Sequence, residues 1–251
     1  TVNSSHALLG RQDDSRGEAT VKGAGSTWNN RTDLYVGYQG NGILTVADGG
    51  TVKSTVTHLA ADDDDSTGTL NLLGSEGARG VLETGYVVKG EGDVSVTLDG
   101  GVLRATGDQS DFLRNFVTGD VTIAAGGAFI DTNGFNINIG AGLSLSGDGS
   151  LTKLGAGTLT LSGTHDYRGG TVIDGGSLQA MVTGALGSGS VRVNQGSLSF
   201  LNSASAGNLA ITNAGGGILF DGRSTAGNAR ITNRGGTFFY GSSTAGSAAI
   251  S

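Results

Sequence analysis

Cysteine and proline are both absent from the 251 residues of this chain. Without cysteine no disulfide can form, so the stability of an extracellular chain of this kind must come from packing and hydrogen bonds. Proline has no backbone N–H and therefore interrupts a sheet. Its absence favours a fold in which nearly every residue donates to a neighbouring strand, and it removes slow isomerisation from folding. Both absences suit a chain that crosses a membrane unfolded and folds promptly outside.

Positive charge is scarce as well. The chain has 15 Lys and Arg residues against 22 Asp and Glu, a net charge of −7. Nucleic acids require a basic surface, so we expect no nucleic-acid partner. No apolar run is long enough to span a membrane and no signal-peptide pattern opens the chain, so we expect neither a transmembrane helix nor a leader. The opening TVNSSHALLG and the end within a repeat at Ser251 lead us to expect a segment of a longer protein.

Glycine, by contrast, is abundant, with 48 residues. Between the glycines, apolar and polar residues alternate, as in the pairs Leu159 with Leu161 and Leu209 with Ile211. This spacing of two is the pattern of a half-buried β-strand, and glycine pairs at the ends of such strands favour sharp corners. The composition therefore predicts an ordered, all-β chain in which these four side chains point inward.

Repeats in the C-terminal fifth define the architecture. Phe200, Phe220 and Phe239 open three similar segments, FLNSASAGNLAITNAGG, FDGRSTAGNARITNRGG and FYGSSTAGSAAIS. Their nearly constant spacing predicts an elongated β-helix (a solenoid) in which one repeat makes one coil, with the phenylalanines stacked in a ladder. At about 20 to 25 residues per coil we expect roughly ten to twelve coils. We divide the chain into an irregular start over 1–20 and a single β-helix over 21–251, with repeats over 150–180 and 200–251.

Two segments depart from this pattern. Four consecutive carboxylates repel one another and cannot be buried together, which predicts an exposed acidic loop formed by Asp62, Asp63, Asp64 and Asp65. Weak calcium binding there is the alternative, although carboxylates that follow one another on an extended chain point to opposite sides. The segment 108–118, DQSDFLRNFVT, has apolar residues spaced for a short helical turn.

The segment LTKLGAGTLTLSGTHDYRGGTVIDGGSLQA, from Leu151 to Ala180, closely resembles the β-strand repeat of autotransporter passenger domains, which Gram-negative bacteria export by type V secretion. The segments GAGSTWNNRTDLYVGYQGNGILTVADGGTV and GDVTIAAGGAFIDTNGFNINIG are similar to other passenger segments. The resemblance implies a right-handed parallel β-helix of pectate-lyase-like shape. It further implies export through a C-terminal outer-membrane barrel that lies outside this chain and is its only link to a membrane.

Residues for catalysis are hard to find. The string Gly147-Asp148-Gly149-Ser150 lacks the serine that a secreted serine protease requires at its third position, and no lipase motif stands in frame with partners. The three histidines, His6, His58 and His165, are far apart in sequence. No cluster suits the calcium and Brønsted base of a polysaccharide lyase, and the calcium-binding nonapeptide is missing. We therefore expect no enzyme, no cofactor and no metal site.

A binding surface is the remaining possibility. Trp28, Tyr35 and Tyr38 lie close together in the sequence, and exposed aromatic rings of this kind stack on sugars or anchor protein partners. Core packing or stacking between coils is the alternative interpretation for these rings. Because Tyr35 alternates with Leu34 and Val36, it is the ring that we expect on an outward face.

Passengers of this family are mostly adhesins, autoaggregation factors and toxins, and the resemblance implies a non-enzymatic role of that kind. We expect adhesion to a host-cell surface protein or glycan, or self-association and biofilm formation through another copy of the chain. A released passenger that activates a host-cell receptor is the alternative, and a polysaccharide lyase is a third. The protein is expected at the bacterial cell surface, attached to the outer membrane, or secreted.

Overall fold

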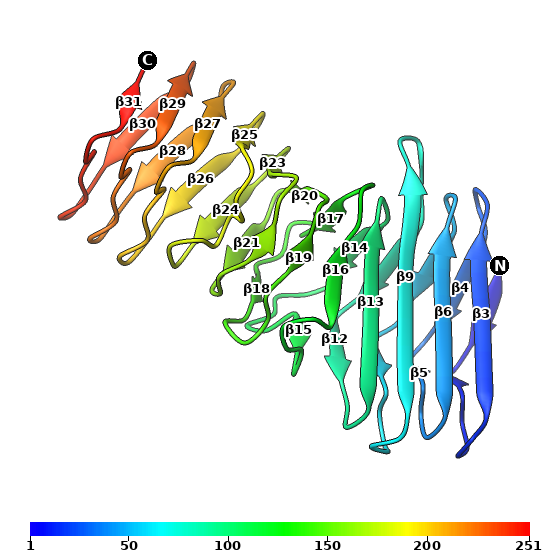
Figure 1. Ribbon diagram of the computed structural model, residues 1–251. Helices are drawn as coiled ribbons and strands as arrows, with labels where there is room; N and C mark the ends of the chain where they lie inside the picture. The colour runs from blue at the N-terminus through cyan, green and yellow to red at the C-terminus, as the bar shows by residue number, and fades with distance from the viewer.

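A computed structural model describes all 251 residues, and every regular element in it is a β-strand. Figure 1 shows the strands stacked along one axis from the N-terminus at the right to the C-terminus at the left. The near strands run upward, the chain passes behind at the top, and each coil advances toward the C-terminus, which is a right-handed path. The predicted all-β parallel β-helix is confirmed. No helix that could span a membrane is present.

One sheet runs the whole length of the molecule, and we call it the long sheet. Its twelve strands pair in parallel from coil to coil, so the coil number agrees with the expected ten to twelve. In order they are β1 (Val2–Ser4), β4 (Thr27–Asn30), β7 (Thr51–Lys53), β11 (Val81–Thr84), β14 (Val102–Ala105), β17 (Ala128–Asp131), β20 (Leu151–Leu154), β23 (Thr171–Ile173), β25 (Val191–Val193), β27 (Ala210–Asn213), β29 (Arg230–Asn233) and β31 (Ala249–Ile250).

Two further sheets close the N-terminal coils into a three-sided tube. The side sheet, on the near side of Figure 1, contains β3 (Arg16–Lys22), β6 (Asn41–Ala47), β9 (Thr67–Ser75), β13 (Asp93–Asp99), β16 (Val121–Ile123), β19 (Ser146–Gly147) and β22 (Asp166–Tyr167), with β10 (Ala78–Arg79) turning back on β9. The short sheet contains β2 (Ala7–Leu9), β5 (Leu34–Val36), β8 (Val56–Leu59), β12 (Tyr86–Lys89) and β15 (Leu113–Arg114).

The C-terminal coils have a different cross-section. The short sheet ends at β15, and a C-terminal sheet takes over with β18 (Ile137–Ile139), β21 (Thr158–Leu161), β24 (Ser177–Ala180), β26 (Ser197–Phe200), β28 (Gly217–Phe220) and β30 (Gly236–Phe239). Here the coils are short and regular. Ile173 pairs with Val193 and Val193 pairs with Asn213, so each of these coils has 20 residues. The N-terminal part contains longer coils. Val52, for example, pairs with Leu82, which is 30 residues further along the chain.

The first residues belong to this stack. Residues 1–20 contain β1, β2 and most of β3, which pair with β4, β5 and β6 of the second coil. The expected helical turn over 108–118 is wrong. Phe112 and Phe116 are buried in the core, and Leu113 lies in β15, because the apolar side chains fill the tube while the backbone continues the short sheet.

Apolar columns fill the interior, one residue per coil. Leu159, Leu161 and Ile211 are buried as expected, and Leu209 is half-buried against the same core. The phenylalanine ladder is confirmed. The rings of Phe200 and Phe220 stack with centroids 4.8 Å apart, and those of Phe220 and Phe239 stack at 5.0 Å. These spacings match the distance between hydrogen-bonded strands, so the ladder follows directly from the coil register.

A fully buried lysine interrupts the apolar interior. Lys153 pairs with Ile130 and Ile173 in one inward column, and its Nζ donates to Thr132 Oγ1 at 2.9 Å. Nζ also donates to three backbone carbonyls at 2.8 to 3.1 Å, those of Leu154, Gly155 and Gly175. Burial lowers the pKa of this ammonium to about 8, and the nearby Asp131 carboxylate opposes the shift. The charge therefore remains at neutral pH and ties the corners of adjacent coils together.

Replacing Ile211 with Asp tests the inward column. Ile211 is buried between Val191 and Ile231, so the variant places an unpaired charge in the core, and we expect a loss of about 3 to 5 kcal/mol in the free energy of unfolding by urea titration. Thr212→Asp is the matched control, since Thr212 is exposed, and it should change stability by under about 0.5 kcal/mol. Equal losses in both variants would contradict the assignment of inward and outward faces.

Replacing Lys153 with Met tests the buried ammonium. The change leaves the carbonyls of Gly155 and Gly175 without a donor, and we expect a loss of about 2 to 4 kcal/mol by the same titration. Lys22→Met, at an exposed lysine, is the control and should stay within about 0.5 kcal/mol of the parent. A Lys153 variant as stable as this control would show that the hydrogen bonds of the ammonium contribute nothing net.

Candidate binding surface

Three rings gather on the outer face of the short sheet. Leu34 and Val36 of β5 point inward and are buried, so Tyr35 between them points outward. The parallel register places Tyr35 beside His58 of β8, and the two rings stack with centroids 4.4 Å apart and planes 13° apart. The ring of Tyr38, in the corner after β5, meets Tyr35 edge-on at 5.3 Å. We call Tyr35, Tyr38 and His58 the aromatic patch.

Stacking between coils determines which parts of the patch a partner can reach. His58 covers one side of Tyr35, and the register places Leu8 of β2 on the other side. A shallow hollow beside the rings is lined by His6, Leu8, Arg11, Tyr35 and Tyr38. The patch therefore presents ring edges and phenolic hydroxyls rather than open ring faces, which suits hydrogen bonding combined with apolar contact.

The patch is uncharged near neutral pH. Nε2 of His58 lies 3.5 Å from Oδ2 of Asp33. Burial lowers the pKa of His58, and the Asp33 carboxylate only partly opposes the shift, so the imidazole is neutral at pH 7. Burial, with Asp33 adding to it, raises the pKa of Tyr35. The aromatic patch thus combines neutral groups with one carboxylate at its margin.

Trp28 lies apart from the aromatic patch. Its side chain stands in the inward column of the long sheet between Val2 and Val52, packs against the core, and donates from Nε1 to Ser4 Oγ at 3.2 Å. The structure therefore brings Tyr35 and Tyr38 together and adds His58. Sequence reasoning missed His58, because coil length varies in this part of the chain and the pairing of His58 with Tyr35 depends on it.

The four aspartates form a loop between β8 and β9. Asp62, Asp64 and Asp65 are exposed, Asp63 is half-exposed, and the backbone N–H of Asp65 donates to Asp63 Oδ1 at 3.1 Å. Asp63 and Asp65 line a small depression together with Asp13 and Asp14 of the first coil. No group of three or more acidic, histidine or cysteine side chains in the molecule has the geometry to hold a metal ion.

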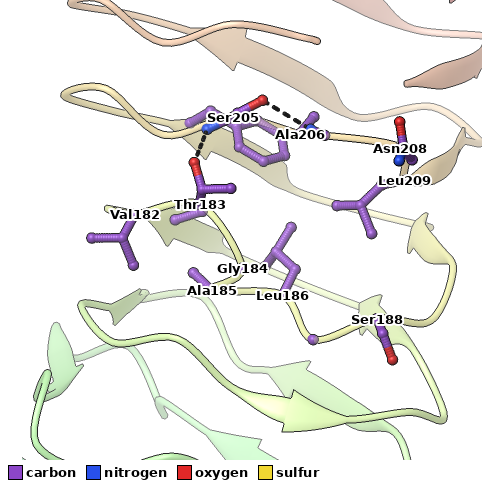
Figure 2. A pocket seen from close by; sticks show the side chains of 14 residues that line it. Val182, Thr183, Gly184, Ala185, Leu186, Ser188, Ser205, Ala206, Asn208 and Leu209 are labelled. Atoms are coloured by element: carbon purple, nitrogen blue, oxygen red, sulfur yellow. Dashed lines mark hydrogen bonds between the residues drawn. The ribbon is translucent and has the colours of Figure 1, made fainter. Parts of the chain in front are cut away.

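A groove opens between two coils near the C-terminal sheet. Figure 2 shows Val182, Thr183 and Leu186 on one wall, facing Ser205, Ala206 and Leu209 on the other. The N–H of Ser205 donates to Thr183 Oγ1 at 3.0 Å, where the following coils use backbone bonds instead. The cavity has a volume of about 290 Å³ and exists because the loop after β24 folds differently from the loops that follow it.

Residues 151–180 match the family model of the passenger-associated transport repeat. This segment contains β20 to β24, with Lys153, in the middle of the solenoid. The chain thus contains a repeat that is typical of autotransporter passengers, and we call it the passenger segment. It is also 35% identical over 111 residues to the adhesin BmaC autotransporter of Brucella suis biovar 1 (strain 1330), a match that covers 38% of this chain and 3% of the relative.

The passenger segment thus spans a small fraction of that much longer relative. No solved structure matches it. Autotransporter passengers stand at the cell surface or are secreted, so the outer faces of the solenoid are the surfaces on which function depends.

Two outward columns of the passenger segment differ in character. On the long sheet, alternating charges form ion pairs of 3.0 Å between Lys53 and Glu83 and of 2.8 Å between Arg104 and Asp131. On the side sheet, one register column is almost free of charge and consists of Thr20, Thr45, Asn71, Thr97, Thr122, Ser146 and Asp166. We call this second set the hydroxyl column.

Histidine, serine and carboxylate side chains do meet in the passenger segment, but in separate pairs. Ser5 Oγ lies 3.2 Å from Nδ1 of His6, whereas Asp33 pairs with a different histidine, His58. A nucleophile relay needs the serine and the carboxylate on the same imidazole. The two pairs therefore do not assemble a nucleophilic triad.

Replacing all four aspartates of the loop at 62–65 with serine tests whether the loop is simply solvated. We expect the free energy of unfolding to change by under about 0.5 kcal/mol, because the carboxylates are largely exposed. Adding millimolar calcium should leave the melting temperature of parent and variant unchanged. A calcium-dependent rise in the parent that the variant lacks would instead establish a metal site.

Proposed function

We propose that this passenger segment is a non-enzymatic, adhesive part of a bacterial surface autotransporter, and that it binds a host-cell surface protein or glycan through the aromatic patch. The observation that carries the proposal is the position of Tyr35, Tyr38 and His58 on an outer face, where they contribute nothing to the filled interior. The relative from Brucella suis, which is described as an adhesin, supports an adhesive role.

Rigidity supports binding through such a surface. Each coil is hydrogen-bonded to the next along the whole long sheet, and Tyr35 is held between two ladder neighbours. A partner that docks on rings already fixed in place avoids much of the entropy loss that accompanies ordering of mobile side chains. The solenoid therefore acts both as a stiff spacer and as the support for the binding residues.

A mechanism without catalysis agrees with the separation of the Ser5–His6 and Asp33–His58 pairs. Binding requires only that the phenolic hydroxyls and ring edges find complementary groups on the partner. We propose that the segment works in this way while attached to the outer membrane of the bacterium or after release from it.

Self-association is a second candidate, and the hydroxyl column favours it. Its members repeat once per coil in parallel register, and the column carries a charge only at Asp166. The same column on a second copy would meet it with little charge repulsion, and many weak hydrogen bonds in register add to useful affinity.

Replacing Tyr35 and Tyr38 together with Ala tests the proposed adhesive surface. We expect saturable binding of the segment to host cells to weaken at least tenfold, the loss of about 1.4 kcal/mol or more that aromatic anchors commonly contribute. The measurement is a binding isotherm on cultured cells with folded, monomeric protein.

Phe238→Ala with Tyr240→Ala is the matched control, since these two exposed rings lie near the opposite end of the solenoid. It should bind cells as the parent does. Equal binding by all three proteins would refute the aromatic patch as the adhesive site. The same isotherms can be measured on immobilised parent protein instead of cells. If the tyrosine variant binds this surface as strongly as the parent does, the result favours self-association.

A further inference from the structure

His165 occupies an unusual place inside the solenoid. It directly precedes β22, the last strand of the side sheet, and both it and Tyr167 are buried. Beyond β22 the coils keep only the long sheet, the C-terminal sheet and a narrow ladder of bridges at Ser205, Thr225 and Thr244. His165 therefore lies where the three-sided part of the tube gives way to the slimmer part.

The imidazole takes the place of a backbone acceptor in the ladder. The N–H of Leu145, in the preceding coil, donates to Nδ1 of His165 at 3.2 Å. The backbone around it continues the stack in both directions, because Asp166 N–H donates to Leu145 C=O at 2.7 Å and His165 N–H donates to Gly184 C=O at 3.1 Å. One residue thus joins three consecutive coils, with its side chain on one side and its main chain on the other.

This geometry requires the neutral imidazole. Nδ1 accepts a hydrogen bond, so the ring proton must sit on Nε2, which is buried and has no partner. Adding a proton to Nδ1 would turn an acceptor into a donor that faces the N–H of Leu145. It would also place a positive charge in an interior with nothing to compensate it.

No charged group faces the ring. Tyr167 is the titratable neighbour, with ring centroids 6.2 Å apart, and its own hydroxyl is bonded to Thr171 at 2.7 Å. Asp166 and Arg168, on either side of Tyr167, are exposed, and so is Asp148, which follows β19 in the preceding coil. The other segments that stack against this corner, 121–124, 143–146 and 184–188, contain no ionisable residue.

We infer that His165 is an acid-sensitive latch at the junction of the two parts of the solenoid, closed by the Leu145 N–H to Nδ1 hydrogen bond when the ring is neutral and opened when the ring takes up a proton. The opening begins at this corner. Gly184, which receives the main-chain bond of His165, also lines the groove of Figure 2, so the same event loosens one wall of that groove.

The direction of the pH effect follows from burial. Burial lowers the pKa of His165 from 6.5 to about 4. Between these two values the unfolded chain binds a proton that the folded chain does not, so stability is fully present above pH 6.5 and falls as the pH drops toward 4. His165 alone should reduce the equilibrium constant for folding by up to tenfold for each pH unit, and by about 80-fold between pH 6.5 and 4.

The experiment compares the parent with His165→Asn in urea titrations at several pH values from 7.5 to 4. The asparagine carbonyl can accept the Leu145 N–H but does not titrate. We expect the parent to lose about 80-fold more of its folding constant than the variant between pH 6.5 and 4, because the carboxylates contribute equally to both. His6→Asn, at an exposed histidine, should follow the parent. Equal pH dependence of the parent and His165→Asn would overturn the inference.

Hydrogen exchange measured by NMR on the parent keeps the inference testable if His165→Asn does not fold. Protection factors, which correct for the intrinsic pH dependence of exchange, should fall with acid at the amides of Leu145 and His165 before they fall in β6 or β9. The His165 ring should titrate well below pH 6. Uniform loss of protection along the chain, or a ring that titrates near 6.5 in the folded protein, would show that His165 is not a latch.

Discussion

The hydrogen bond from a backbone N–H of one coil to the C=O of the next is the interaction on which the whole molecule depends. It fixes the distance between coils, and with it the stacking of every side chain, since the phenylalanine rings repeat at 4.8 and 5.0 Å. It also restricts the corners. A Cβ on Gly50 would lie 2.3 Å from the carbonyl oxygen of Val21, so a side chain there would separate two coils. The high glycine content is thus a consequence of close stacking.

Within this frame the interior is where polar groups have the largest effect. Lys153 and His165 are both buried, and both bond to the backbone of neighbouring coils rather than to a carboxylate. Each does so in the segment that matches the passenger-associated transport repeat. The repeat therefore combines an ordinary apolar core with two side chains that connect successive coils at the point where the cross-section changes.

The exterior is free of these packing demands, and this freedom allows a function to be placed there. Charged side chains can alternate on the long sheet, hydroxyls can repeat on the side sheet, and three rings can gather on the short sheet without any change in the coil. A partner meets a rigid surface whose chemistry differs from face to face. The proposed adhesive role requires only that one of these faces be complementary to a host molecule.

Sequence alone determined the class of fold, because alternation within strands and a regular repeat between coils leave few alternatives to a solenoid. The inward positions of Leu159, Leu161 and Ile211 and the phenylalanine ladder followed from the same two periods. Only part of the aromatic site could be predicted from the sequence. Tyr35 was expected to face outward, but Trp28 proved to lie in an inward column, and His58 could not be paired with Tyr35 until the register of an irregular coil was known.

Only the tertiary structure decided these pairings, since coils of unequal length differ in their loops and the loop lengths set the register. The same reason explains the error over 108–118, where apolar spacing that suits a helical turn serves a strand whose neighbours bury Phe112 and Phe116. Local sequence carries the pattern of a strand. Which strands meet, and which buried polar atom finds a partner, depends on contacts between residues a full coil apart.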